Sequence, residues 1–395
     1  MAKNIVLCLD GTGNRITENQ SSVSRIFDLI RDDCKFYDTG IGTDTNFNDW
    51  ERIRTKVNSW WQLGTGAGLD AKLLTAYNFV CRNYETDDRV YIFGFSRGAY
   101  TARALAGFIH NFGLLDANNL HLADDALVAY KNISRRKGDT DDVFSQMRSL
   151  ERTLDTKRPV IEFLGLFDTV NSVMIPGARK VADLSILKLP STDDNHSVRK
   201  VAHAIAIDEQ RMFFRPALWN GTRFRSNRFG GDFEDQQVEQ VWFPGVHGDI
   251  GGSTGADDNP AGKLALAWMF DQSPDTLNWA ASAETKIKGG TFRGTPYTAP
   301  DAAAPLADSM TKWWRRLEYL RPLPKAEWIS HVPRQSFLGR IWPPIFQPRH
   351  IPTEHALHES VLARRTALQY EPEPVKDYLR RRPDVIGSAN ATDQP

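Results

Sequence analysis

One serine in a glycine-bounded turn is the clearest candidate nucleophile of this chain. Residues 94–98 are GFSRG, which matches the pattern G-x-S-x-G, with an apolar run before it and a helical pattern after it. Such a serine stands on a sharp turn between a strand and a helix, and Gly94 and Gly98 relieve the crowding in that turn. This context favours Ser96 as a nucleophile over the alternative, a serine that only caps a helix.

A serine nucleophile needs a base that takes its proton and an acid that orients the base. On this kind of turn the partners follow along the chain in the order Ser, Asp or Glu, His. Asp168 is the predicted acid because it ends the strand-like run PVIEFLGLFD. The alternatives are that Asp168 caps the next segment, or that the acid is one of three other aspartates, Asp183, Asp208 or Asp249.

His247 is the predicted base. It lies in the glycine-rich loop PGVHGDIGG directly after an apolar run, where the backbone is free to turn the imidazole toward the serine. The alternative is an ordinary histidine of a surface loop. His355 and His358 stand three residues apart in HALHES, but no third ligand is spaced to complete a zinc site. We therefore assign these two to a helix start or a supporting position, and we expect neither a metal nor a cofactor.

Ester cleavage also needs backbone N–H groups that bind the developing oxyanion. The N–H of Arg97 directly follows the nucleophile, and the loop DGTGN brings Gly11 and Thr12 as further candidates. Asp10 and Asp249 are assigned supporting roles, in which Asp10 braces its own loop.

The segment LDGTGN also resembles two phosphate-handling motifs, and it fits neither of them. Phosphatases that form an aspartyl phosphate use D-x-D-G-T, and here Cys8 replaces the nucleophilic aspartate. A phosphate-binding loop needs Lys followed by Ser or Thr, and this loop has neither. The segment GTGAGLD at 64–70 follows no clear strand and misses the spacing G-x-G-x-x-G, so it does not indicate a dinucleotide site.

Four apolar runs would bring the candidate residues to one edge of a sheet. They are NIVLCLD, RVYIFGF, PVIEFLGLFD and VEQVWFPG, and helical patterns cover residues 71–84 and 99–112. The alternation predicts an α/β-hydrolase-like fold with a doubly wound, mostly parallel sheet. In such sheets ligands bind beyond the carboxyl ends of the strands, where the four turns would meet.

The chain divides by composition into a predicted core, a cap and a tail. The α/β-hydrolase catalytic core is expected at 1–270 with a helical insertion at about 116–158, a Trp- and Pro-rich cap or lid packed on the core at 271–382, and a flexible tail at 383–395. Residues 313–316 put two tryptophans beside two arginines, which suits a lid or an acyl pocket at a lipid interface. The alternative is that the tryptophans of this region pack against the sheet.

The charge balance, the cysteine content and the length of the apolar runs argue against several classes of protein. The 49 basic and 49 acidic residues cancel, so no overall charge favours nucleic acid or an anionic membrane. The 3 cysteines do not indicate a disulfide framework, and no apolar run approaches the roughly 20 residues of a membrane-spanning helix. The first residues lack the pattern of a cleaved signal peptide, so we expect synthesis in the cytoplasm, and export by a signal-independent system stays open.

Eight segments of the chain recur in the same order in a known protein family. They are LDGTGN, YDTGIGT, GAGLDAKLLTAYNFVCRNY, RVYIFGFSRGAYTARALAGFIHNFGLL, LGLFDTV, AIDEQRMFF, VWFPGVHGDIGG and HESV. On these the chain resembles an α/β-hydrolase family that includes the phospholipase effectors of bacterial type VI secretion systems. The resemblance implies Ser96 as nucleophile, Asp168 as acid and His247 as base. The chain departs from the family at Gly248 and Ser253.

The residues and the resemblance together predict a serine hydrolase that cleaves acyl esters through an acyl-enzyme, foremost a phospholipase or lipase-like esterase. The alternatives are an esterase or amidase for a small soluble substrate, and a non-catalytic binding protein with a hydrolase fold. Expected partners are the acyl ester or phospholipid and, transiently, a membrane surface, but not nucleic acid. If the protein is an effector, the resemblance adds a secretion apparatus and an immunity protein.

Overall fold

A seven-stranded sheet forms the centre of the molecule in the computed structural model. The structure describes residues 2–11, 20–39, 67–135, 153–170, 174–176, 184–186, 189–211, 214–226, 232–253, 259–312, 314–315, 346 and 348–385. The strands of the sheet are β1 (Asn4–Leu9), β2 (Cys34–Asp38), β3 (Arg89–Phe95), β4 (Ile161–Phe167), β7 (Val198–Ala206), β10 (Gln237–Phe243) and β13 (Ala356–Leu357). Their order is β13-β10-β7-β4-β3-β1-β2, and all neighbouring pairs are parallel, which confirms the predicted α/β class.

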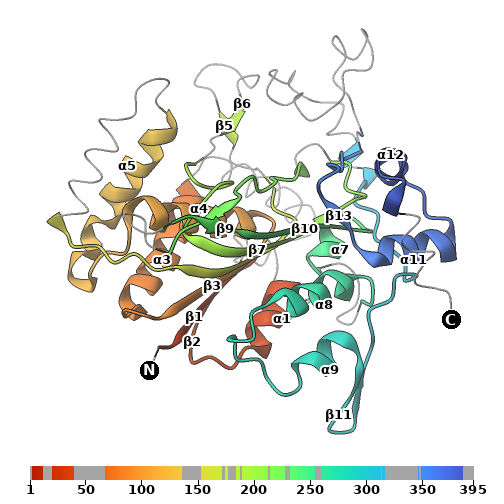
Figure 1. The fold of residues 1–395 in the computed structure, drawn as a ribbon, viewed down its shortest axis with the longest axis horizontal. Coiled ribbons are helices and arrows are strands. Elements are labelled where there is room, and N and C mark those ends of the chain that lie inside the picture. Colours follow the sequence, from red (N-terminus) through yellow and green to blue (C-terminus); the bar gives the residue numbers. More distant parts are fainter. Residues whose placement is uncertain are drawn as a thin grey trace.

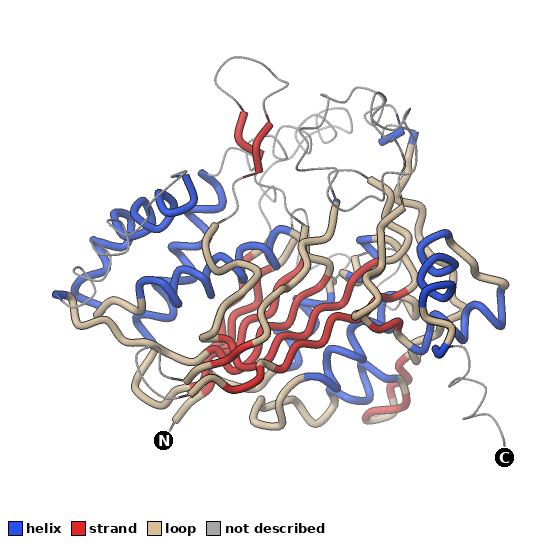
Figure 2. The backbone as a smooth tube through the Cα atoms, turned by 45° about the horizontal axis from the view of Figure 1, so that its top comes forward, coloured by secondary structure: helices blue, strands red, loops and turns tan. Residues whose placement is uncertain are grey.

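Helices cover both faces of this sheet. One face carries α3 (Ala67–Asn83), α4 (Arg97–Phe112) and α5 (Ala123–Arg135), and the other carries α1 (Ser22–Leu29), α8 (Gly262–Gln272) and α9 (Ala283–Lys288) (Figures 1 and 2). In β1, Ile5 and Leu7 pack toward α3 and α4, whereas Val6 and Cys8 pack toward α1 and α8. Because both faces of the strand are buried, its sequence is apolar without alternation.

Shorter elements lie around the sheet. They are the 3-10 helix η1 (Ala117–Leu122), the helices α7 (His247–Ile250), α11 (Glu359–Leu368) and α12 (Glu373–Arg381), and the strand pairs β5 (Met174–Pro176) with β6 (Leu184–Ile186), β8 (Arg223–Phe224) with β9 (Glu234–Asp235), and β11 (Gly290–Phe292) with β12 (Thr295–Tyr297). η1 and α5 fall in the predicted helical insertion. Tyr130 of α5 packs on Phe108 of α4, with ring centroids 5.4 Å apart.

The winding direction of the chain reverses at β1. From β1 the chain crosses to β2 on one side, and it later returns to place β3 on the other side. Loops that leave the carboxyl ends of two such strands run apart, and ligand sites form in the crevice between them. Gly11 follows β1 and Ser96 follows β3, and both residues line one cavity. The candidate nucleophile therefore stands at the switch point of the sheet.

Residues 356–381 add an edge strand to the sheet and also pack two helices against it. β13 pairs with the edge of β10, and Trp242 of β10 shares a buried cluster with Val361 of α11 and Tyr378 of α12. The predicted boundary at residue 270 lies inside α8, so it does not mark a break between elements. None of the helices in the described parts of the chain combines the length and the apolar character that crossing a membrane requires.

Candidate active site

Ser96 occupies a strained turn between β3 and α4. Its φ is 58° and its ψ is −120°, a region that residues other than glycine rarely adopt. A Cβ atom at Gly98 would lie 2.1 Å from the carbonyl oxygen of Leu9, and one at Gly94 would lie 2.6 Å from the Cα of Ala99. Since these neighbours are backbone atoms, both positions need glycine, as the sequence pattern predicted.

Ser96, Asp168 and His247 form one hydrogen-bonded chain. His247 Nε2 lies 2.8 Å from Ser96 Oγ, and His247 Nδ1 lies 2.6 Å from Asp168 Oδ2. All three residues are nearly inaccessible to solvent, at 6%, 0% and 6% exposure in the order Ser, Asp, His. The structure thus brings together the three side chains that were selected from the sequence.

The electrostatics of His247 suit a proton acceptor. Burial lowers the pKa of His247 below its usual value, although Asp168 acts in the opposite direction. The imidazole is therefore neutral near pH 7. An ionised Asp168 can only accept hydrogen bonds, so Nδ1 of His247 donates to it and Nε2 accepts from the Ser96 hydroxyl. The rings of Phe95 and Phe214 pack against the imidazole, with centroids 4.8 and 4.7 Å away.

A cavity of about 320 Å³ opens at Ser96 and His247. Its walls include Phe214, Arg211 and Trp314. The guanidinium carbon of Arg211 lies 3.6 Å from the centre of the Phe214 ring and 5.1 Å from that of Trp314, so the cation contacts two aromatic rings. The cavity therefore combines aromatic walls with the side chain of an arginine.

A family model confirms the suspected resemblance. The model for the catalytic domain of Tle1-like phospholipase effectors of type VI secretion matches residues 3–272. The chain belongs to this family. An uncharacterized protein of Saccharomyces cerevisiae is 29% identical to this Tle1-like chain over 227 residues, which are 54% of this chain and 32% of the yeast protein.

Two solved structures are also similar to the Tle1-like chain. An uncharacterized protein from Pseudomonas aeruginosa shows 18% identity and a TM-score of 0.33, with 72% of this chain and 50% of the other covered. A Tle1 effector bound to the VgrG spike shows 21% identity and a TM-score of 0.28, with 65% and 52% covered. The chain spans between 32% and 52% of the length of these three relatives.

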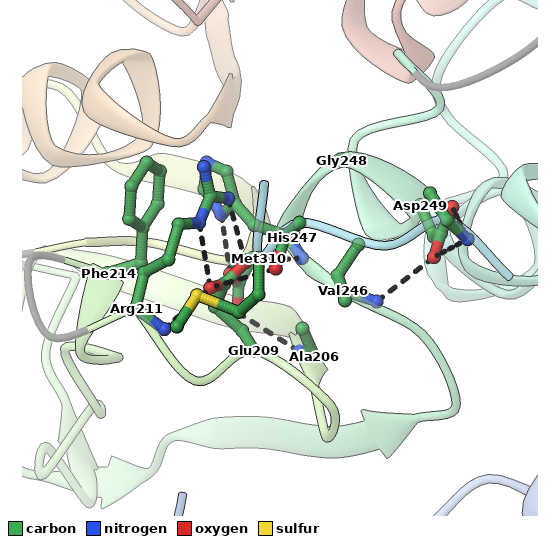
Figure 3. Close-up of polar contacts among 12 residues, drawn as sticks. Ala206, Glu209, Arg211, Phe214, Val246, His247, Gly248, Asp249 and Met310 are labelled. Atoms are coloured by element: carbon green, nitrogen blue, oxygen red, sulfur yellow. Dashed lines mark hydrogen bonds and ion pairs between the residues drawn. The ribbon is translucent and has the colours of Figure 1, made fainter. Parts of the chain in front are cut away.

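Two of the aspartates that rivalled Asp168 bind other groups through their carboxylates. Asp208 accepts from the N–H of Gly245 at 2.7 Å and from the hydroxyl of Tyr370 at 2.7 Å. Asp249 accepts from the N–H of Val246 at 3.0 Å (Figure 3). Asp208 and Asp249 thus hold the loop that carries the base, which fits the supporting role predicted for Asp249. Asp183 lies outside the described residues.

Arg349 is a site residue of the Tle1-like chain that the sequence did not indicate. Its Nη1 donates to Asp168 Oδ1 at 2.6 Å, and its Nη2 donates to Asp168 Oδ2 at 2.9 Å. Burial would raise the pKa of Asp168, but the charge of Arg349 and the contact with His247 hold it well below its usual value. Arg349 stands in the irregular segment QPRHIP, which carries no periodic signal.

A second buried ion pair touches the backbone of His247. Glu209 Oε2 accepts from the N–H of His247 at 3.3 Å, and Arg211 donates to both oxygens of Glu209, each at 2.8 Å (Figure 3). Burial would raise the pKa of Glu209, but Arg211 lowers it below its usual value. This pair was also missed, although AIDEQR is part of a segment that resembles the family.

Gly11, which follows β1, lies beside the nucleophile. A Cβ atom at Gly11 would lie 3.3 Å from the Cβ of Ser96. The carboxylate of Asp10 is fixed at the start of the loop, because it accepts from Tyr37 Oη at 2.7 Å and from Ser21 Oγ at 2.5 Å. Asp10 also accepts from the N–H of Gly11 at 2.6 Å, so that donor is engaged within the loop. The roles of Arg97 and Gly11 in oxyanion binding stay predictions, and Thr12 lies outside the described residues.

The other histidines of interest serve packing and capping. The side chain of His358 accepts from the N–H of Ser360 and caps α11, which confirms the predicted helix start. His355 accepts at Nδ1 from Trp242 Nε1 at 3.1 Å. Among the described residues no three His, Cys, Asp or Glu side chains are grouped to hold a metal. His203, which was not anticipated, accepts at Nε2 from the N–H of Thr169 at 3.1 Å and thereby supports the turn of Asp168.

Proposed function

We propose that the Tle1-like chain is a serine ester hydrolase that cleaves acyl esters of lipids, with phospholipids as its substrate class. Membership of the Tle1-like phospholipase family supports lipid hydrolysis. The observation that carries the serine mechanism is the chain from Ser96 through His247 to Asp168, with contacts of 2.8 and 2.6 Å. This order of groups is the one that nucleophilic acyl transfer requires.

In the proposed reaction the Ser96 oxygen attacks the carbonyl carbon of the ester while His247 Nε2 takes the hydroxyl proton. The tetrahedral intermediate collapses, the bond to the alcohol oxygen breaks, and His247 returns its proton to that oxygen. A water molecule then attacks the acyl-enzyme with the same base, which releases the fatty acid and restores the serine. Asp168 stays ionised throughout and stabilises the imidazolium.

The cavity supports an ester with one apolar and one polar end. The rings of Phe95, Phe214 and Trp314 offer apolar surface for an acyl chain. Arg211 lies on the same wall, where it pairs with Glu209 through Nε and Nη2, and its Nη1 would donate to an anionic group of the alcohol part. A phospholipid carries both an acyl chain and a phosphate, so it fits this wall better than an uncharged small ester does.

We also include a secretion spike and an immunity protein among the proposed partners, and export by a signal-independent system. The support is the family and the similar Tle1 effector, whose structure contains a VgrG spike. Co-purification of the Ser96→Ala variant with a co-expressed VgrG spike tests the spike as a partner without dependence on activity. Failure to co-purify would remove the spike from the proposal and leave the hydrolase part unaffected.

Labelling with a fluorophosphonate probe tests the proposed activity. We expect the wild-type protein to be labelled and Ser96→Ala to remain unlabelled, because the probe bonds only to an activated serine. Ser253→Ala is the matched control, since Ser253 lines the same cavity and its contact to Gly248 O is long, at 3.5 Å. Its labelling should equal that of the wild type.

Hydrolysis of phospholipid vesicles and of short p-nitrophenyl esters, measured on the same variants, then assigns the substrate class. Faster turnover of the vesicles supports the phospholipid proposal. Labelled protein that cleaves only the short ester would favour a soluble-ester hydrolase. Labelling of Ser96→Ala to the wild-type level would contradict the serine mechanism.

A further inference from the structure

Arg349 contacts Asp168, the proposed acid, from a distant part of the chain. It follows Asp168 by 181 positions and lies beyond residues 3–272, which the family model covers. Its exposure is 3%, and its guanidinium contacts both carboxylate oxygens of Asp168. A two-point contact between an arginine and a carboxylate fixes the plane of the carboxylate as well as its charge.

The backbone holds the guanidinium in turn. Arg349 Nη1 donates to the carbonyl of Ala206 at 2.8 Å, and Nη2 donates to the carbonyl of Phe214. The N–H of Ala206 donates to Asp168 Oδ1 at 3.0 Å, and the Phe214 ring packs on His247. Arg349 therefore links the acid, the end of β7 and the aromatic wall beside the base.

We propose that Arg349 is a positioning residue of the hydrolase: it holds the carboxylate of Asp168 in the orientation in which Oδ2 meets Nδ1 of His247. This inference rests on the proposed function, because it concerns the same triad. It extends the functional unit to a residue outside the region that defines the family. Asp168 Oδ2 serves both Arg349 and His247, so movement of the guanidinium would move the acid away from the base.

The position of Arg349 has an electrostatic consequence for the base. Among the described residues, the charged or titratable groups that face His247 are Asp168, Glu209 and Arg211. Arg349 and His203 lie behind Asp168, and Asp308 lies in the cavity wall. Loss of the Arg349 charge would leave Asp168 without its main counter-charge. The protonated form of His247 would then be favoured, and its pKa would rise. Since only the neutral imidazole accepts a proton, the acid limb of kcat/KM would move to higher pH.

Two substitutions separate orientation from charge. Arg349→Lys keeps the charge but loses the two-point contact, so we expect kcat to fall about 10- to 100-fold while the acid limb stays in place. Arg349→Met loses both, so we expect a similar or larger fall in kcat and an upward shift of the acid limb by about one pH unit. Both variants are compared through full pH profiles of kcat and kcat/KM for one ester substrate.

Arg364→Met is the matched control for a merely structural effect. Arg364 is also buried and bonds the carbonyls of Ala302 and Ala304, at 2.6 and 2.7 Å, without contact to the triad. Its loss should lower thermal stability and leave the pH profile and the kcat of the folded fraction unchanged. An Arg349→Met profile equal to that of Arg364→Met would overturn the proposal.

Two further measurements apply if a variant folds poorly or if the protein does not act as a serine hydrolase. If Arg349→Met does not fold, Arg349→Lys decides, and a wild-type kcat in that variant would overturn the positioning role. Fluorophosphonate labelling of the wild type reports on the hydrolase proposal independently. An unlabelled wild type contradicts the proposed function, whereas a labelled wild type beside an unaffected Arg349→Lys contradicts only the role of Arg349.

Discussion

The region that the family model covers and the residues that follow it contribute different things to the site. Residues 3–272 contain Ser96, Asp168 and His247, each at a turn that follows a strand. Beyond them come Arg349 on both oxygens of Asp168 and Trp314 on the cavity wall. The first region holds the groups proposed for the chemistry and part of the wall around them, and the second adds further groups that orient and enclose them.

This difference shows that the matched region is electrostatically incomplete without the rest of the chain. Asp168 is fully buried, and a buried charge is tolerable only when it is paired and hydrogen-bonded. Its arginine partner comes from beyond residue 272. The matched region therefore contains the proposed nucleophile, base and acid, whereas the arginine that pairs with the acid lies outside it.

Ser96→Ala should have the largest effect, and it tests the region that the family model covers. We expect turnover to fall by about 10⁴-fold or more, because the nucleophile is removed. Thermal unfolding should change little, since the backbone of the turn is kept. Hydrolysis rates and thermal melts of purified protein check both parts, and turnover near the wild-type rate would contradict the assignment of Ser96.

Asp168→Asn tests the ion pair with Arg349, which joins the two regions. It leaves Arg349 as a buried cation without its carboxylate partner, so we expect a loss of about 3–5 kcal/mol in the free energy of unfolding together with a severe loss of activity. The double variant Asp168→Asn/Arg349→Met removes both charges and should recover part of the stability but none of the activity. Urea unfolding measures the recovery, and equal stability of the single and double variants would contradict the pairing.

Gly98→Ala tests the backbone geometry of the matched region alone. The added Cβ would lie 2.1 Å from the carbonyl oxygen of Leu9, and neither backbone can yield easily. We expect a loss of about 3 kcal/mol or more in the free energy of unfolding. Gly262→Ala is the control, because its Cβ would approach no closer than 3.2 Å, and its effect should be clearly smaller. Similar stability of the two variants would contradict the close approach.

Trp314→Ala should have the smallest effect, and it probes the part of the cavity wall that lies beyond residue 272. We expect kcat/KM for a long acyl ester to fall about 10-fold, since the loss of one aromatic contact to the chain corresponds to roughly 1.4 kcal/mol. A short acyl ester should be cleaved at the wild-type rate. The ratio of the two rates is the measurement, and an equal effect on both esters would place Trp314 away from the acyl chain.

Much of this site could be predicted because its residues follow recognisable strands. The runs that lead to Ser96, Asp168 and His247 became β3, β4 and β10, as expected. β7 was not predicted, because Lys200 and His203 interrupt its apolar pattern. The predicted lid rests largely on residues 313, 328 and 342, which lie outside the described residues, so that hypothesis stays a prediction.

The sequence by itself determined which residues could do chemistry and the sheet that carries them. Strand periodicity and the glycines of a tight turn are local properties, and parallel strands bring their carboxyl ends to one edge whatever follows. Only the tertiary structure decided that Arg349 pairs with Asp168, that Glu209 and Arg211 hold the backbone of His247, and that Trp314 lines the cavity. Such contacts join irregular segments far apart in the chain, and they depend on burial and charge pairing, which leave no pattern in the neighbouring residues.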